Sequence, residues 1–203
     1  MSEMSNADDK RRDRSVGPLG YYWFITFEHA PDLHALTKEC QQAIDTTYFY
    51  PVPSDGLHLT LDRIAYDGES GLEQLDSIVT AARRAFQDQN PFTLTIEQPG
   101  NLRGAIGFKV SPAERVRNLR DALRSATLSV LPEAPVKESI FVPHVTIAYP
   151  ASEGLSSMPI DLVEINTANR RADVPVIEVA MVLLERREFC YSWDVYARIS
   201  LGR

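Results

Sequence analysis

The sequence predicts an α+β fold: a bilobal, duplicated arrangement of strand–helix–strand units, with two antiparallel-rich sheets, helices outside and a central groove. The order strand, helix, strand occurs twice along the chain. Each second strand carries a histidine and a threonine two residues apart, in His58-Leu-Thr-Leu61 and in His144-Val-Thr-Ile147. The first strand of each unit precedes its histidine by a similar distance, 34 residues from Phe24 and 36 residues from Phe108. We therefore expect a single bilobal domain over residues 18–203.

The first unit starts with an aromatic and β-branched segment. Residues Tyr21–Phe27 predict a central strand that is covered on both faces. Pro31 then opens a helix, because proline suits the first helical position and apolar residues follow at helical spacing. These apolar residues are Leu33, Leu36, Cys40 and Ile44. A proline-rich loop over Tyr48–Gly56 leads to the first His-x-Thr strand, which starts at Leu57.

A helix and a hairpin separate the two units. Ser70–Glu73 has the form of a capping box, which predicts a helix start, and an apolar stripe follows at helical spacing. The stripe consists of Leu72, Leu75, Val79, Ala82 and Phe86. Two predicted strands, Phe92–Glu97 and Ala105–Val110, are joined by a turn at Pro99–Asn101 and form a hairpin.

The second unit repeats the order of the first. Ser111–Glu114 combines an N-cap serine, a proline at the first helical position and a capping-box glutamate. The buried stripe of this helix consists of Val116, Leu119, Leu123, Ala126 and Val130. Beyond the second His-x-Thr strand we expect a short helix within Met158–Arg171 and a strand over Val174–Leu184. A turn at Arg186–Phe189 then leads into the last strand, Tyr191–Leu201.

Composition and charge narrow the possible partners. The formal net charge of −7 argues against a protein that grips long nucleic acid through its phosphates, so we expect no DNA partner. No apolar run is long enough to span a membrane, and the polar residues 1–17 are expected to form a disordered tail without a signal peptide. We expect a cytoplasmic monomer whose two cysteines, Cys40 and Cys190, are reduced structural thiols, although the sequence leaves a disulfide between them open.

The repeated polar pair is the feature that points to chemistry. Strand side chains alternate between faces, so His58 and Thr60 project to one face of their strand, as His144 and Thr146 do in the second unit. If a pseudo-twofold relates the units, two imidazoles and two hydroxyls meet in one groove. Two histidines beside one phosphorus atom can divide acid–base work, because an ordinary pKa of about 6.5 leaves both forms accessible at neutral pH. The threonine hydroxyls would hydrogen-bond the non-bridging oxygens, where charge accumulates.

These paired motifs resemble those of the two-histidine phosphoesterase superfamily, and most closely its 2'-5' RNA ligase (RNA 2',3'-cyclic phosphodiesterase) branch. The resemblance covers roughly Tyr21 to the C-terminus. It implies metal-independent action, without a cofactor, on 2',3'-cyclic phosphates or 2'-5' phosphodiester linkages of RNA ends or nucleotides. It also implies that His58 protonates the leaving oxygen and that His144 activates water.

The chain departs from this family in its basic residues. Many members place a basic residue shortly after the second motif, where this chain has Ala148-Tyr149. By strict alternation Tyr149 lies on the apolar face of its strand, so we expect a core aromatic there. Arg63 falls on the leucine face of the first motif strand and would reach the groove only through a bulge or beyond the strand end. Asp62 falls on the His58 face, where it would orient an imidazole or be solvated.

The phosphate-binding cation is therefore not identified by the sequence. Lys109, Arg103 and the pair Arg170-Arg171 are candidates that nothing in the sequence separates. A structural interpretation of the motif histidines, as hydrogen-bonded strand residues, is disfavoured by their paired threonines. A zinc site is disfavoured because only two strong ligands are visible, without a clustered third.

Three hypotheses on function follow. The first is a hydrolase, a cyclic nucleotide or RNA 2',3'-cyclic phosphodiesterase with possible 2'-5' RNA ligase activity, in which His58, Thr60, His144 and Thr146 are catalytic. The second is an RNA ligase that runs the reverse chemistry, with a 5'-hydroxyl in place of water. The third is a module that binds a nucleotide or an RNA end with little turnover.

Overall fold

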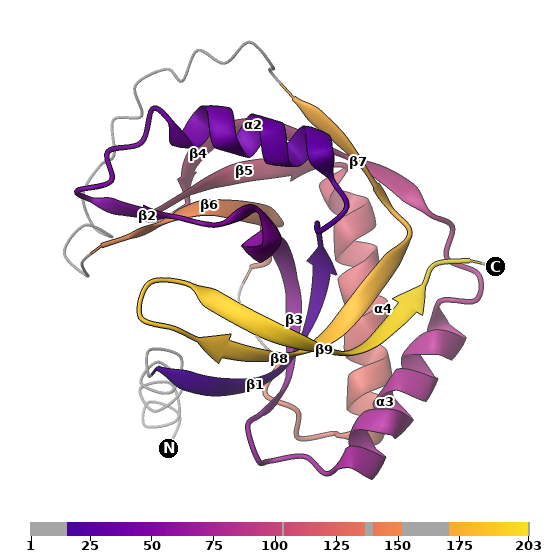
Figure 1. The fold of residues 1–203 in the computed structure, drawn as a ribbon. Coiled ribbons are helices and arrows are strands. Elements are labelled where there is room, and N and C mark those ends of the chain that lie inside the picture. Colours follow the sequence, from indigo (N-terminus) through magenta and orange to yellow (C-terminus); the bar gives the residue numbers. More distant parts are fainter. Residues whose placement is uncertain (1–15, 103, 137–139, 152–170, 203) are drawn as a thin grey trace.

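The computed structural model describes residues 16–102, 104–136, 140–151 and 171–202, and these residues form two antiparallel sheets (Figure 1). One sheet has the order β3-β1-β8-β9, with bounds β1 Gly17–Thr26, β3 His58–Tyr66, β8 Glu178–Arg186 and β9 Tyr191–Ser200. The other has the order β2-β6-β5-β4-β7, with bounds β2 Phe49–Pro51, β4 Phe92–Leu102, β5 Ala105–Ser111, β6 His144–Pro150 and β7 Ala172–Val176. The predicted α+β class with antiparallel sheets is confirmed.

The predicted strand–helix–strand repeat is present in the topology. In the first unit, β1 pairs antiparallel with the motif strand β3, and α2 (Pro31–Gln41) lies between them in sequence. In the second unit, β5 pairs antiparallel with the motif strand β6, and α4 (Ala113–Val130) lies between them. A third described helix, α3 (Leu72–Ala85), packs against α4. Each motif strand therefore lies next to the first strand of its own unit.

The helices interlock the two units. Helix α2, from the first unit, packs on the sheet that contains β6 and β7, whereas α4, from the second unit, packs against β3 (Figure 1). The fully buried Trp23 of β1 donates a hydrogen bond from Nε1 to Thr127 Oγ1 of α4 at 3.0 Å. Gln41 of α2 donates from Nε2 to the carbonyl oxygen of Ile147 on β6 at 2.8 Å. This exchange of helices, with the core that it buries, fixes one motif strand relative to the other.

Strand β1 is central, and both of its faces are covered, as the sequence predicts. Trp23 and Ile25 point into the main core, which both sheets share. Tyr22 and Phe24 point to the opposite face. There they join a smaller apolar cluster of Leu19, Ala180, Val182 and Leu184.

The predicted hairpin turn is wrong by a few residues. Pro99–Asn101 does not turn but continues β4, paired with β5. The register shifts between Ile96 and Pro99, which marks a bulge, and the chain reverses only between Leu102 and Ala105. Proline lacks the amide hydrogen of a regular ladder position, and a bulge is one of the few places in a sheet that accept it.

Three further element predictions need correction. The predicted strand Val174–Leu184 is two strands in different sheets, β7 and β8, which are separated by the exposed Ile177. Its apolar pattern runs on across the break, so periodicity does not reveal the change of sheet. The predicted loop Tyr48–Gly56 contains the short strand β2 and a 3-10 helix, Ser54–Gly56. Residues 1–15 of the predicted tail (1–17) and residues 158–170 of the predicted short helix (Met158–Arg171) lie outside the described residues, whereas Gly17 already belongs to β1.

Both predicted helix caps differ from those observed. Helix α3 is capped one residue later than expected, at Gly71, whose amide donates to Gln74 Oε1 at 3.1 Å. This shift leaves Leu72 67% exposed and outside the buried stripe. Helix α4 has no side-chain cap, because Ser111 still belongs to β5, where it pairs with Thr95. Within the described residues, no helix is long and apolar enough to span a membrane.

Candidate active site

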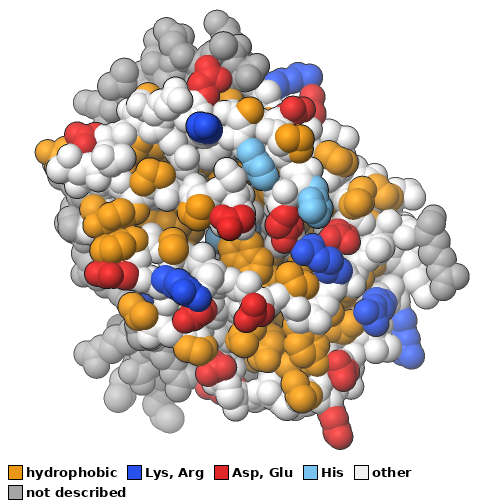
Figure 2. Space-filling model, in the orientation of Figure 1, with side chains coloured by type: hydrophobic (Ala, Val, Ile, Leu, Met, Phe, Trp, Pro, Cys, Tyr) orange, Lys and Arg blue, Asp and Glu red, His pale blue; other side chains and the backbone are white. Residues whose placement is uncertain are grey.

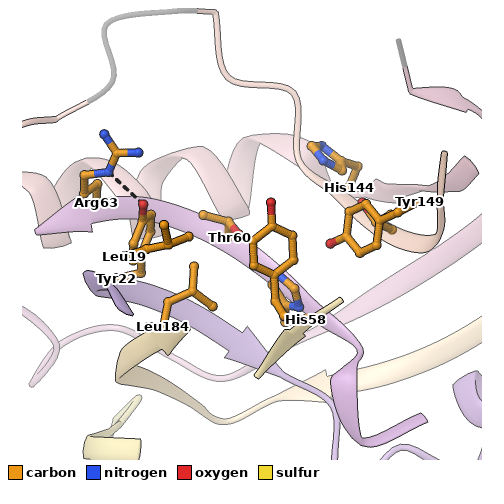
Figure 3. A pocket seen from close by; sticks show the side chains of 10 residues that line it. Leu19, Tyr22, His58, Thr60, Arg63, His144, Tyr149 and Leu184 are labelled. Atoms are coloured by element: carbon orange, nitrogen blue, oxygen red, sulfur yellow. Dashed lines mark hydrogen bonds between the residues drawn. The ribbon is translucent and has the colours of Figure 1, made fainter. Parts of the chain in front are cut away.

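The four residues predicted to carry the chemistry line one cavity of about 220 Å³ (Figure 3). His58 and Thr60 come from β3, and His144 and Thr146 come from β6, two strands in contact with each other. The other lining residues are Leu19, Tyr22, Arg63, Tyr149, Leu184 and Tyr191. The structure thus brings together both His-x-Thr pairs, and we call this cavity the cleft.

The two histidines are held in the same way. His58 Nδ1 lies 2.9 Å from the carbonyl oxygen of Gly56, and His144 Nδ1 lies 2.8 Å from that of Val142. In each case the acceptor is two residues earlier in the chain. A carbonyl oxygen can only accept, so Nδ1 carries the hydrogen in both imidazoles. Nε2 is therefore the atom of each ring that is left to take up or release a proton.

The surroundings of the two histidines differ. The ring of His58 stacks on Phe24, with centroids 4.4 Å apart, and meets Trp193 edge-on at 5.0 Å. Burial, with a smaller contribution from the nearby His144, lowers the pKa of His58 to about 4, against the raising effect of the hydrogen bond to the Gly56 carbonyl. His144, by contrast, is exposed to solvent. The cleft therefore has one imidazole in its wall and one at its mouth.

Arg63 reaches the cleft because β3 is bulged. Thr60 and Asp62 pair with the consecutive β1 residues Phe24 and Trp23, so Leu61 is an extra residue in the strand. The extra residue shifts the alternation, and Arg63 returns to the face of His58, opposite Tyr22. The expectation from strict alternation, that Arg63 faces the leucine side, is wrong. The sequence leaves a bulge or a position beyond the strand end as routes to the groove, but it does not mark where a bulge occurs.

Strand β6 has the same bulge at the same distance from its histidine. Thr146 and Ala148 pair with the consecutive β5 residues Gly107 and Ile106, so Ile147 is the extra residue. Tyr149 then returns to the face of His144 and lines the cleft (Figure 3). The prediction that Tyr149 is a core aromatic is therefore wrong for the same reason.

Arg63 and Tyr149 thus occupy equivalent positions in the two units, each five residues after its histidine. Figure 3 shows Arg63 at one end of the cleft and Tyr149 at the other, beside His144. Arg63 is only 3% exposed and donates to the hydroxyls of Tyr22 and Tyr66 at 2.8 and 2.7 Å. The Tyr149 phenol contacts the Thr146 side chain through a hydrogen bond, and burial raises its pKa well above the ordinary value.

Asp62 does not face His58. The bulge turns its carboxylate to the other side of β3, where Arg124 Nε of α4 donates to Oδ2 at 2.7 Å. Its other oxygen accepts the backbone amide of Arg63 at 3.1 Å. Asp62 therefore connects the bulged part of β3 to α4 through these two hydrogen bonds, and it does not orient an imidazole.

The candidate cations now separate by position. Lys109 lies opposite His144 on β5, exposed to solvent. Arg171 is exposed and directly precedes β7, the edge strand that lies three strands away from β6 in the sheet. It forms an ion pair with Asp173 at 3.1 Å. Arg103 and Arg170 lie outside the described residues.

In the part of the chain that the structure describes, no group of three or more His, Cys, Asp or Glu side chains is placed to hold a metal ion. Both cysteines are free.

An α+β fold in which two equivalent strands present His-x-Thr pairs to one cleft defines a two-histidine phosphoesterase. The chain belongs to the 2'-5' RNA ligase superfamily, whose family model matches residues 29–188. The resemblance that the motifs indicate is thereby confirmed. No curated relative matches the sequence.

Solved structures share this fold. The protein TT0787 of Thermus thermophilus superposes with a TM-score of 0.69 at 22% identity, over 91% of this chain and 100% of that one. E. coli LigT complexed with 3'-AMP has a TM-score of 0.68 at 19% identity, over 92% of this chain and 99% of LigT. LigT complexed with NADP⁺ gives a TM-score of 0.66, with the same identity and coverage. These similarities show the fold.

Proposed function

We propose that this protein is a metal-independent phosphodiesterase that hydrolyses 2',3'-cyclic phosphate ends of RNA or nucleotides, or 2'-5' phosphodiester linkages, by two-histidine acid–base catalysis. The observation that carries the proposal is the matched anchoring of His58 and His144. Both imidazoles line one cleft, and both donate Nδ1–H to a carbonyl two residues earlier. Their Nε2 atoms are thereby available to a phosphate in the cleft. Family membership and the nucleotide complexes of LigT support the same substrate class.

In the proposed reaction, His144 Nε2 takes a proton from water as the water oxygen forms a bond to phosphorus. The bond from phosphorus to a ribose oxygen breaks on the opposite side, and His58 Nε2 gives that oxygen its proton. The product is a phosphomonoester beside a free hydroxyl. His144 suits the base role because it is exposed, so that water reaches it. His58 suits the acid role because it lies in the wall of the cleft, where the leaving ribose oxygen is shielded from solvent.

Because His58 has a low pKa, substrate binding must also raise this pKa before His58 can act as an acid. With a pKa of about 4, His58 is neutral in the free protein at pH 7 and must gain a proton before it can act as an acid. A bound phosphodiester carries a negative charge, which favours the imidazolium form. Binding is therefore expected to take up a proton and so prepare the acid.

Hydroxyl groups stabilise the charge on phosphorus in this proposal. Thr60 and Thr146 line the cleft on opposite strands and hydrogen-bond the non-bridging oxygens, on which negative charge grows during the reaction. Tyr149 adds a third hydroxyl next to Thr146. Its raised pKa keeps the phenol protonated and able to donate.

A direct assay tests the proposal. The protein, treated with EDTA, is incubated with 2',3'-cyclic AMP and with an RNA that ends in a 2',3'-cyclic phosphate, and the phosphomonoester products are resolved. We expect hydrolysis of at least one substrate without added metal. An RNA with a 5'-hydroxyl is added in a parallel reaction, because the same side chains would serve ligation. No turnover of any substrate, or activity that returns only with Zn²⁺ or Mn²⁺, would overturn the proposal.

A further inference from the structure

Lys109 is placed beside His144 by strand pairing. The two residues are direct partners in the register of β5 and β6. Partners in an antiparallel pair point to the same face, with Cβ atoms about 5 Å apart. The neighbours of Lys109 along the strand, Phe108 and Val110, point into the main core, which confirms that Lys109 points to the cleft side. The Lys109 side chain therefore starts beside the exposed His144, on the side of the sheet that carries the cleft.

Within the described residues, no side chain forms an ion pair with Lys109. Among residues 16–102, 104–136, 140–151 and 171–202, Lys109 takes part in no ion pair and no side-chain hydrogen bond, and it is exposed. Arg63, a charged residue that lines the cleft, differs in its accessibility. Its guanidinium is buried and donates to two tyrosine hydroxyls. Lys109 is thus the more accessible positive charge for an incoming anion.

The strand partner of His58 in the first unit, which corresponds to Lys109 in the second, lies in a region of net negative charge. The strand partner of His58 is Thr26, whose hydroxyl receives Arg198 Nη1 at 3.3 Å. Arg198 also pairs with Glu178 at 2.7 Å and with Glu28 at 3.0 Å. One guanidinium between two carboxylates leaves a net negative charge beside His58. The strand-partner position beside His144 therefore favours an additional anion more than the strand-partner position beside His58 does.

We infer that Lys109 binds a phosphate of the RNA chain next to the phosphate that reacts, so that the protein prefers an RNA end to a free cyclic nucleotide. This inference rests on the proposed function. A single lysine suits the task, because phosphate contacts position a nucleic acid through charge and need no shaped pocket. One such contact is also compatible with the net charge of −7, which disfavours only a long electrostatic footprint.

The test compares two substrates in one variant. Lys109→Met is assayed on 2',3'-cyclic AMP and on a short RNA that ends in a 2',3'-cyclic phosphate. We expect kcat/KM for the RNA to fall about tenfold and kcat/KM for cyclic AMP to change less than about twofold. The slope of log kcat/KM for the RNA against log salt concentration is expected to fall by about 0.7, the value for one phosphate contact on a single strand. Lys109→Arg is expected to keep most of the preference for RNA.

Lys38→Met serves as the matched control, because Lys38 is an exposed lysine on α2, outside the cleft. Equal losses on both substrates would overturn the inference, since Lys109 would then act on His144 or on the reacting phosphate. No loss on either substrate would also overturn it. If the wild-type protein turns over neither substrate, the proposed function fails, and fluorescence anisotropy with labelled RNA still decides whether Lys109 contributes to binding. Equal affinity of the wild type and Lys109→Met would then reject the inference by itself.

Discussion

Phe24 and His58 lie with their rings stacked, 4.4 Å between centroids and 14° between planes. Phe24 is fully buried, and Trp193 packs at a steep angle against both the imidazole and the Phe24 ring. This enclosure lowers the pKa of His58 to about 4. We expect the imidazole of His58 to titrate near pH 4 in an NMR titration of the free protein. Upon addition of 3'-AMP the midpoint should rise, because a bound phosphate favours the charged ring. A midpoint near 6.5 in the free protein, or no rise with 3'-AMP, would contradict this interpretation.

The same shift makes stability depend on pH. The unfolded chain binds a proton at His58 below about pH 6.5, whereas the folded chain binds it only near pH 4. The unfolded state therefore holds more protons within this window, and stability falls as the pH is lowered through it. The loss is at most about 3 kcal/mol, and smaller to the extent that water in the cleft reaches the ring. His58→Gln is expected to flatten the pH dependence of urea unfolding between pH 6.5 and 4. An unchanged slope would show that other groups cause it.

Tyr149→Phe tests the hydroxyl next to Thr146. Removal of one oxygen keeps the ring contact with Tyr191, at 5.3 Å, and deletes one donor to the phosphate. We expect kcat to fall about tenfold to a hundredfold, with a smaller change in KM, because the donor matters most as charge develops. Tyr50→Phe is the matched control: Tyr50 is the β2 partner of Tyr149 but does not line the cleft. Equal effects of the two substitutions would argue against a contact to phosphate.

Gly107→Ala tests the packing behind the second motif. A Cβ atom at Gly107 would collide with the carbonyl oxygen of Val145 and with the Leu102 side chain. Because one obstacle is backbone of β6, the strand that carries His144 must shift, and we expect a loss of about 1–3 kcal/mol in stability together with reduced activity. Gly100 faces Gly107 on β4 and has open space around it. Gly100→Ala should be close to neutral, and similar unfolding midpoints for both variants would reject this account.

The sequence predicts the fold class and the four motif residues because their signals are local. Period-two alternation and a repeated His-x-Thr pair are readable within five residues of chain. The two bulges are not readable in this way, since Leu61 and Ile147 look like ordinary alternating apolar residues. Each bulge changes the face of the residues that directly follow it, which include Arg63 in β3 and Tyr149 in β6. For this reason the sequence misplaces Arg63 and Tyr149, by the same physical cause.

Charge patterns on the surface depend on pairing across strands and are also hidden from the sequence. Lys109 is one of several candidate cations until strand pairing sets it opposite His144. The neutralisation of Arg198 involves Glu28 and Glu178, which are far apart in the chain. On the face shown in Figure 2, basic and acidic side chains are interspersed. The position of Lys109 beside His144 is visible only in the folded arrangement.

The central claim is that His58 and His144 act on the phosphate as an acid–base pair. The measurement that tests it most directly is kcat/KM for hydrolysis of an RNA 2',3'-cyclic phosphate end by the wild type, His58→Ala and His144→Ala, with the fold of each checked by circular dichroism. His29→Ala is the matched control, because His29 is exposed and does not line the cleft. The account predicts that each cleft variant loses about 10²- to 10⁴-fold and that the control keeps wild-type activity. Wild-type activity in either folded cleft variant would contradict it.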